Sequence, residues 1–313
     1  MRLGAIGRGQ GWRRGRLASA VGLLAVLPMI VARGLPPVGA AALATVVGTD
    51  AVNIRACPGL ACEVIAAAPL GYALTVIGDP VDGFTPVSYG NQVGFAYDLY
   101  LATDPASVPY LAQGAPGCKR LALIFNIGIG EEPATGIFDT LTGQGVPATM
   151  FPMGWWAQAR PDLVARMKQD GFIIGSHGNQ QRVLTGLSDA EVAREVRASR
   201  VAIGGALGSA PGPWYTPYAA AGDARVRAII AAEGFLPVSW TVPADDYGPG
   251  ATAIGVYDRV MRNVTDGAII EMHLDGPASA LSTGVALPWL IADLRAEGYQ
   301  FVTIPQMTEP CPA

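Results

Sequence analysis

Histidine is nearly absent from this chain of 313 residues, which contains only His177 and His273. Histidine is the usual side chain for binding metals and for moving protons near neutral pH, so a site of either kind has only these two to use. Cysteine offers no substitute, because the four cysteines lack the Cys-x-x-Cys spacing of zinc sites. The residues around the two histidines therefore decide what chemistry the chain can perform.

Acidic residues are missing from residues 1–44, which contain six arginines, five of them before Leu17. A short apolar run follows, from Leu17 to Ala32, and the segment ends near Ala42-Leu43-Ala44. This order is typical of a secretory signal peptide, and the run is short for a bilayer span of about 20 residues. We expect a secreted or cell-envelope protein. The alternative is an uncleaved leader, and only then would a membrane be a partner.

Basic residues are not in excess after residue 44, where 15 Lys and Arg face 25 Asp and Glu, a net charge of −10. Nucleic acid binding rewards a basic face, so we expect no nucleic acid partner. The same charge argues against simple adhesion to anionic polymers.

The four cysteines are an even number in a chain expected to be exported, which suggests disulfides. Cys57 and Cys62 flank a Pro-Gly turn, and Cys118 and Cys311 bracket the rest of the chain. We therefore predict the pairs Cys57–Cys62 and Cys118–Cys311.

Residues 45–103 contain short apolar runs separated by Gly, Pro and Asp turns, a pattern that predicts a small all-β domain. Val52-Asn53-Ile54-Arg55 precedes one such turn, and Gly94-Phe95, Tyr97 and Tyr100-Leu101 close the region. With these pieces the region resembles the bacterial Src-homology-3-like module, which commonly binds cell-wall peptides or glycans; a spacer role is the alternative. Residues 104–117 are rich in Pro, Ala and Gly and predict a linker.

From Cys118 to the end, strand-like runs alternate with helix-like ones, which predicts a parallel sheet, most simply a (β/α) barrel. The expected strands are 120–126, 148–152, 172–175, 236–240, 268–273 and 300–303. The expected helices are 134–142, 162–170, 189–203, 224–232 and 288–298, with Ser188 and Glu191 forming a capping box before the third.

Residues 118–307 resemble the polysaccharide deacetylases with NodB homology, carbohydrate esterase family 4, whose motifs follow one another in the family's order. The resemblance implies a distorted (β/α) barrel and metal-assisted removal of acetyl groups from chitin-like glycans, peptidoglycan or xylan. The first motif, Thr-Phe-Asp-Asp-Gly, reads Ile124-Phe125-Asn126-Ile127-Gly128 here. Asn126 thus replaces the family's base and Ile127 replaces a metal ligand, and neither can do that work.

The second motif, His-x-x-x-His, holds two metal ligands in the family and runs here from His177 to Gln181. His177 is the residual ligand, and a single imidazole beside an amide is too little for zinc. The third motif, Arg-x-Pro-Tyr, reads Tyr215-Thr216-Pro217-Tyr218, so the arginine that holds the base is also missing. We expect Tyr215, Pro217, Tyr218 and Trp155 to contact sugar rings. Trp156 and Trp214 could offer stacking surfaces as well, and core packing is the alternative for all of these.

The remaining motifs preserve the acid half of the family's mechanism. His273 ends an apolar strand and matches the histidine that protonates the leaving group, and Asp246 matches the aspartate that orients it. Glu271 is unusual for the family, and could be a partner for His273, a replacement donor or a residue of the strand's rim.

Together these residues predict an exported two-domain protein, a small β barrel followed by a deacetylase-type (β/α) barrel. We expect it to bind a cell-wall glycan or other polysaccharide, to have lost its catalytic activity, and to need no cofactor. One alternative is a working deacetylase with a rebuilt site, which would use zinc or another divalent cation. The other is a structural envelope protein that binds another protein.

Overall fold

The computed structural model describes residues 42–130, 132–309 and 311. Most of the expected signal peptide, residues 1–41, therefore lies outside the described residues. Its expected last residues, Leu43 and Ala44, instead begin the first strand, where the Ala44 side chain is buried. The folded region thus starts before residue 45.

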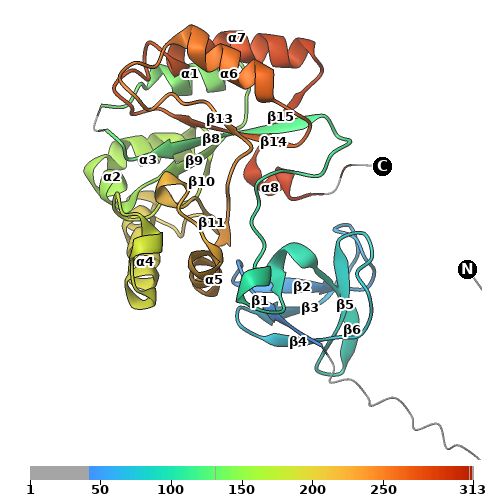
Figure 1. Ribbon diagram of the computed structural model, residues 1–313. Helices are drawn as coiled ribbons and strands as arrows, with labels where there is room; N and C mark the ends of the chain where they lie inside the picture. The colour runs from blue at the N-terminus through green and yellow to red at the C-terminus, as the bar shows by residue number, and fades with distance from the viewer. Residues whose placement is uncertain (1–41, 131, 310, 312–313) are drawn as a thin grey trace, which may run out of the picture. The chain divides into compact units, whose positions relative to one another are not determined.

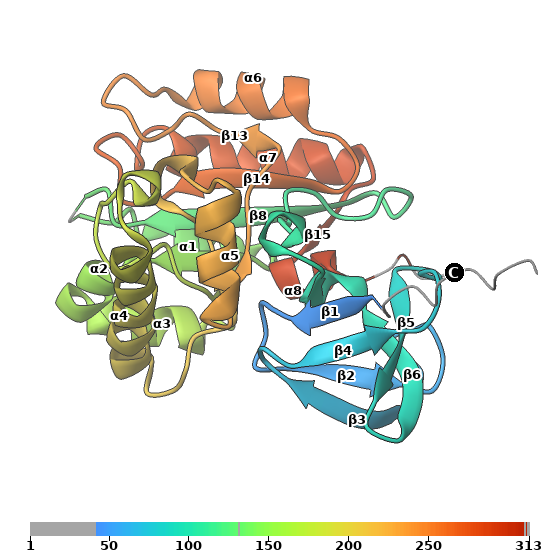
Figure 2. The same cartoon turned by 60° about the horizontal axis from the view of Figure 1, so that its bottom comes forward.

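The N-terminal region is built of short antiparallel strands (Figure 2). Their pairing gives the order β3-β2-β6-β5-β4-β1-β7. The strands are β1 (Leu43–Val46), β2 (Ala51–Arg55), β3 (Val64–Pro69), β4 (Ala73–Val76), β5 (Phe84–Tyr89), β6 (Gln92–Tyr97) and β7 (Leu101–Ala102). Buried aliphatic side chains such as Ile54, Leu74 and Val87 form its core. The region is all-β as expected, and its relation to the Src-homology-3-like modules stays a prediction.

The segment expected as a linker, residues 104–117, is partly built into the second region. Asp104 caps a short 3-10 helix, η2 (Pro105–Ser107), by accepting hydrogen bonds from two backbone amides. Leu111 is buried, and its backbone amide donates to the Pro237 carbonyl at 3.0 Å. The α/β domain therefore begins near residue 111 rather than at Cys118.

Parallel strands form the centre of the α/β domain, and β8 lies in the middle of their sheet. The strands are β8 (Arg120–Ile127), β9 (Thr149–Pro152), β10 (Ile173–Ile174), β11 (Trp214–Tyr215), β12 (Leu236–Pro237), β13 (Val242–Pro243), β14 (Ala268–His273) and β15 (Gln300–Val302). β8 pairs with β14 along one edge and with β9 and β15 along the other. Every residue of β8 and β14 is buried, as expected for strands covered on both faces.

Residues 236–243 close these strands into an irregular ring. At one end of this segment β12 pairs with β11, which a bridge from Tyr215 to Ser176 links to the loop after β10. At the other end β13 pairs with β14. The strand order therefore returns to its start, which agrees with the distorted (β/α) barrel that the sequence predicted.

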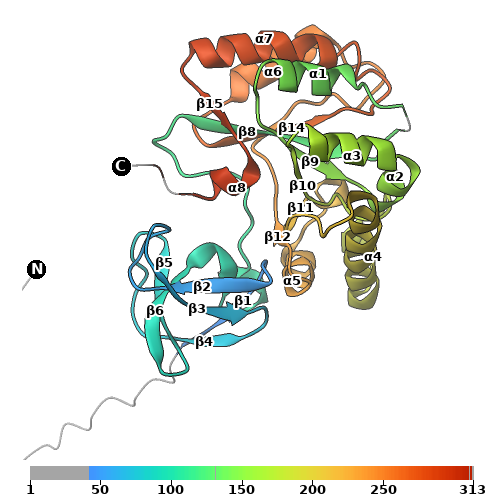
Figure 3. The ribbon, with the colours of Figure 1, turned by 180° about the vertical axis from the view of Figure 1, so that it is seen from behind.

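Helices cover the outside of these strands, with α1, α6 and α7 on one side of β8 and β14 (Figure 1). α4 lies beside α5 (Figure 3). The helices are α1 (Gly136–Gly143), α2 (Gly154–Ala159), α3 (Pro161–Gln169), α4 (Asp189–Leu207), α5 (Ala224–Ala232), α6 (Ala253–Asn263), α7 (Thr283–Ala296) and α8 (Ile304–Met307), with 3-10 turns η1 (Asp98–Tyr100), η3 (Leu184–Gly186) and η4 (Tyr218–Ala220). The expected capping box of Ser188 and Glu191 begins α4.

The helix predictions were wrong in two respects. α7 begins at Thr283, so Pro288 lies inside the helix instead of at its first turn, where proline is usually favoured. α2 and α6 were not expected at all. In α6 the signal was present but weak: Thr252 caps the helix, and Val256 and Val260 lie one turn apart on its buried face.

The two disulfides are those that the sequence predicted. Cys57 is bonded to Cys62 within the N-terminal sheet, and Cys118 is bonded to Cys311. The second bond links the start of β8 to the segment after α8. Among the described residues, no helix combines the length and the apolar character needed to cross a membrane.

Candidate active site

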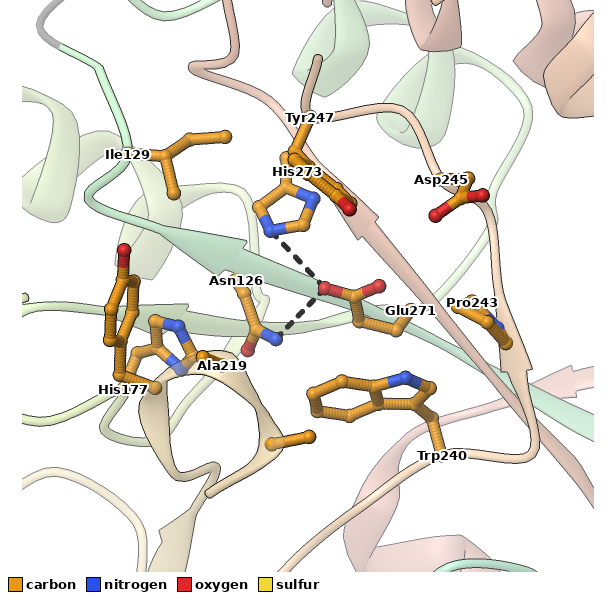
Figure 4. A pocket seen from close by; sticks show the side chains of 12 residues that line it. Asn126, Ile129, His177, Ala219, Trp240, Pro243, Asp245, Tyr247, Glu271 and His273 are labelled. Carbon is orange, nitrogen blue, oxygen red and sulfur yellow. Dashed lines mark hydrogen bonds and ion pairs between the residues drawn. The ribbon is translucent and has the colours of Figure 1, made fainter. Parts of the chain in front are cut away.

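A pocket of about 390 Å³ opens at the carboxyl ends of β8 and β14 (Figure 4). In parallel barrels this end carries the residues that act on ligands, because the loops after the strands converge there. The polar residues of its wall are Asn126, His177, Asp245, Glu271 and His273, and the aromatic ones are Tyr218, Trp240 and Tyr247. The pocket therefore brings together both histidines of the chain and the asparagine that replaces the expected base.

His273 is held in place by Asp246. Its Nδ1 lies 2.8 Å from Oδ1 of Asp246, and its backbone N–H donates to Oδ2 at 2.8 Å. The Thr283 hydroxyl also donates to this fully buried carboxylate. Since a carboxylate only accepts hydrogen bonds, Nδ1 of His273 carries a proton. Asp246 therefore orients the imidazole in the way that the resemblance to the family implied.

A second carboxyl group faces the other nitrogen of His273. Its Nε2 lies 3.2 Å from Oε1 of Glu271, whose side chain is buried. Burial alone would lower the pKa of His273, but the hydrogen bond to Asp246 and the charges of Glu271 and Asp246 outweigh it and raise this pKa to about 9. His273 is therefore protonated at neutral pH. Of the roles considered for Glu271, the geometry supports a partner for His273.

Asn126 is fully engaged with its neighbours at the end of β8. Its Nδ2 donates to Oε1 of Glu271 at 3.1 Å, and its Oδ1 accepts from the Thr216 hydroxyl at 2.7 Å. A carboxylate in this place could not donate to Glu271, so the amide matches what surrounds it. Because an amide does not take up a proton near neutral pH, Asn126 cannot activate water as a general base.

His177, in the loop after β10, is buried beside Thr216. Its Nδ1 lies 2.9 Å from the Thr216 carbonyl oxygen and 2.8 Å from the hydroxyl. The carbonyl only accepts, so Nδ1 carries the proton and the lone pair is on Nε2, which has no hydrogen-bond partner among the described residues. Burial, helped by the charge of His273, lowers the pKa of His177 to about 3. His177 is therefore neutral.

The two other positions that correspond to metal ligands do not offer donors to a cation. Ile127 is fully buried in the hydrophobic core, and Gln181 uses its Nε2 to donate to the Gly128 carbonyl at 2.6 Å. Zinc takes three or four nitrogen, sulfur or carboxylate ligands. Within the part of the chain that the structure describes, no three His, Cys, Asp or Glu side chains gather into such a set. The residues around His177 thus do not fit a zinc ion.

Most of the aromatic residues expected to contact sugar are buried in the core. Tyr215 is fully buried and packs on Phe235, with the ring centres 5.7 Å apart, so no sugar ring can stack on it. Trp156 and Trp214 are buried as well. Tyr215 is buried because of its place on β11. Its side chain packs in one hydrophobic cluster with apolar side chains of helices α4 and α5.

Tyr218 does line the pocket, as expected, while Pro217 and Trp155 do not. Pro217 precedes the turn η4, which presents Tyr218, and the ring N–H of Trp155 points at the Met153 sulfur at 3.3 Å. The pocket's other aromatic walls, Trp240 and Tyr247, lie close in the sequence to Asp246, the residue expected at the site. This closeness was the available signal.

Two threonines complete the site and were missed by sequence reasoning. Thr216 links His177 to Asn126, and Thr283 at the start of α7 donates to Asp246. Both contacts join residues far apart in the chain, and no local pattern marks them. The result is one network across the floor of the pocket, made of hydrogen bonds and of the ion pair between Glu271 and His273. It runs through His177, Thr216, Asn126, Glu271, His273, Asp246 and Thr283.

Comparison with known proteins agrees with this arrangement. Residues 113–238 match the model of the polysaccharide deacetylase family. The α/β domain is a polysaccharide deacetylase domain. The peptidoglycan-N-acetylglucosamine deacetylase PgdA of Listeria monocytogenes is 32% identical over 190 residues, which cover 60% of this chain and 39% of that protein. The chain thus spans less than half the length of this relative.

Two further proteins resemble this chain over a larger share of their own length. A peptidoglycan-N-acetylglucosamine deacetylase of Bacillus cereus is 26% identical over 240 residues, covering 76% of this chain and 81% of the relative. Among solved structures, a carbohydrate esterase family 4 pseudoenzyme from Bacillus anthracis matches with a TM-score of 0.59 and 25% identity, covering 64% of this chain and 68% of that one. The family therefore includes a described pseudoenzyme with the same fold.

Proposed function

We propose that this protein binds a cell-wall glycan or a related polysaccharide in the pocket of its deacetylase domain and does not deacetylate it by the family's metal-dependent route. The names of the relatives, peptidoglycan-N-acetylglucosamine deacetylases, support the class of ligand. The observation that carries the loss of activity is Asn126, whose amide is hydrogen-bonded at both ends and can take no proton.

Magnitudes support this proposal over a weakly active enzyme. Loss of a general base typically costs about 10²–10⁴ in rate, and loss of a metal that polarises the substrate costs several kcal/mol, roughly another 10³. If the two losses multiply, activity falls about a millionfold below that of a working relative. The retained pair of His273 and Asp246 supplies only the proton for the leaving group and does not offset this loss.

The expected location of the protein also belongs to this proposal. A leader of the signal-peptide type would bring the chain to the cell envelope, where peptidoglycan and other glycans are available. The N-terminal sheet would then add a second contact to the same polymer. Removal of residues 1–41 from a tagged chain, which leaves β1 in place, should abolish export, and export without this segment would contradict the proposed location.

Acetate release tests the proposed loss of activity directly. Purified protein is incubated with N-acetylated chitooligosaccharides and with peptidoglycan, with and without added zinc, cobalt or nickel, beside a working family member. We expect no acetate above background from this chain and sedimentation of the protein with at least one of the polymers. Turnover that a chelator abolishes would contradict the proposal, as would the absence of binding to any glycan.

A rebuilt hydrolase is the second candidate, because His273 remains protonated and Oε2 of Glu271 has no partner among the described residues. In that case Glu271 would have to activate water in place of Asn126. This reading predicts acetate release that Glu271→Gln abolishes. If zinc or another divalent cation were used, elemental analysis would find one metal ion per chain.

A further inference from the structure

We infer that the pocket recognises a sugar ring that carries a free ammonium group, as in a de-N-acetylated glycan, in preference to an N-acetylated ring. This inference rests on the proposed glycan binding and names the chemical form of the ligand. It is carried by the hydrogen-bonding roles of the atoms on the pocket floor and by the aromatic wall beside them.

The floor of the pocket presents acceptors because its donors are already used. Asn126 Nδ2 and His273 Nε2 both point at a single oxygen, Oε1 of Glu271, at 3.1 and 3.2 Å. Burial raises the pKa of Glu271, and the charge of His273 and the hydrogen bond from Asn126 oppose that rise. The second oxygen, Oε2, has no hydrogen-bond partner among the described residues, and Glu271 lines the pocket. Glu271 therefore presents to the pocket an acceptor that no protein group uses.

The charge around this acceptor favours a cation. Protonated His273 lies between Glu271 and Asp246, so it balances one of these two carboxylates. Asp245, also in the pocket wall, is paired with Arg259 at 2.8 Å. The carboxyl groups that act on His273, those of Glu271, Asp246 and Asp275, thus outnumber the one cation among them. An ammonium group at Oε2 of Glu271 would add a second cation and favour the ionised form of this carboxyl group.

The pocket wall next to Glu271 is aromatic. Figure 4 shows the Glu271 carboxylate between the indole ring of Trp240 and the side chain of Asp245. Tryptophan is the side chain that attracts a cation most strongly through the face of its ring, and it also gives a flat surface on which a sugar can lie. A carboxylate beside an indole ring is thus suited to an amino sugar.

An acetamido group fits this floor less well. Its carbonyl oxygen needs a hydrogen-bond donor, and the floor's donors from Asn126, His273 and Thr216 are all directed at protein acceptors. Burying that carbonyl beside the free oxygen of Glu271 would bring two acceptors together, which is unfavourable. The ammonium form instead supplies three donors.

Calorimetric titration of the full chain with a glucosamine pentamer and with an N-acetylglucosamine pentamer tests the inference. We expect the glucosamine pentamer to bind at least about tenfold more tightly at low salt, and the preference to shrink as salt screens the charge. Equal affinity, or tighter binding of the acetylated pentamer, would overturn the inference and leave the proposed glycan binding in place. Failure of both to bind would overturn the proposed function as well.

Two variants locate the preference. Glu271→Gln removes the charge with little change of shape and should abolish the preference, while Glu297→Gln makes the same change on the exposed end of α7 and should keep it. Asp245→Asn is a second variant outside the His273 contacts, and it should weaken the preference by a smaller factor. A preference unchanged in folded Glu271→Gln protein would contradict the placement, and the wild-type comparison decides the inference even where a variant fails to fold.

Discussion

The two histidines of the pocket are almost equally hidden from solvent, at 2% exposed for His177 and 6% for His273, yet one is neutral and the other is positively charged. Burial favours the neutral form of both. His177 has only the hydroxyl and carbonyl of Thr216 as hydrogen-bond partners, and its pKa falls to about 3. His273 has a carboxylate at each ring nitrogen, and its pKa rises to about 9. The neighbours, and not the depth of burial, decide the charge.

The two halves of the pocket also differ in how they compare with the family's motifs. In the His273 half, His273 and Asp246 stand where the resemblance implies the histidine and aspartate that donate a proton. The His177 half has become neutral, with an asparagine, a glutamine and an isoleucine in place of carboxylates and an imidazole. Each half is hydrogen-bonded in its present form.

The largest expected effect follows from removing a charge in the His273 half of the pocket. Asp246→Asn leaves a buried amide nitrogen facing donors from His273 and Thr283, so we expect a loss of about 3–5 kcal/mol in the free energy of unfolding. In the neutral half, Thr216→Val removes one hydroxyl and should cost about 1–2 kcal/mol. Urea unfolding of both variants measures the contrast, and equal losses would contradict the assignment of charge to the His273 half.

The pH dependence of stability gives the next largest contrast. The pKa of His273 is raised on folding from its ordinary 6.5 to about 9, so its protonation stabilises the fold below pH 6.5 and this contribution is lost as the pH rises through 9. The difference in unfolding free energy between wild type and His273→Gln should therefore fall by about 2–3 kcal/mol from pH 6 to pH 9.

His177→Gln is the matched control for this experiment. The pKa of His177 is lowered on folding to about 3, so its contribution to stability is lost as the pH falls through 6.5. The corresponding difference in unfolding free energy should rise by about 1 kcal/mol from pH 6 to pH 9, opposite in sign to that of His273. Slopes of the same sign for the two variants would show that the neighbours do not set the charge states.

A smaller effect is expected where the two halves meet. Asn126→Asp would restore the family's residue but would place a second carboxyl group against Oε1 of Glu271, with no donor between them. We expect a loss of about 1–3 kcal/mol in unfolding free energy at pH 7, reduced in acid where one carboxyl group takes a proton. The single change should not release acetate with added zinc, because Ile127 and Gln181 remain; activity with unchanged stability would contradict this account.

The sequence predicted the strands that build the pocket because their signals are local. β14 has the expected bounds, Ala268–His273, and β8 extends the expected strand by one residue to Ile127. Both are apolar runs buried on two faces, which are easy to recognise. The prediction for α7 lacks the first five residues of the helix, because proline favours the first turn and Pro288 therefore predicts a start there. In the structure, tertiary packing overrides that local preference.

The site could be predicted only as far as the family motifs reach. They located both histidines, Asp246 and Asn126, all of which the fold brings into one network. They could not show that Tyr215 faces the core, since that depends on the packing of β11, nor that Thr216 joins His177 to Asn126. Such contacts depend on how distant segments meet, and a single sequence does not encode them in any short pattern.

A zinc titration followed through the imidazole signals of the protein tests the central claim most directly. Because the chain contains only two histidines, each gives its own NMR resonances, and no other imidazole can confuse the assignment. We predict that zinc at a stoichiometric amount leaves the resonances of His177 unchanged, as expected for a pocket without a metal site. A saturable shift of the His177 resonances at one zinc ion per chain would contradict it.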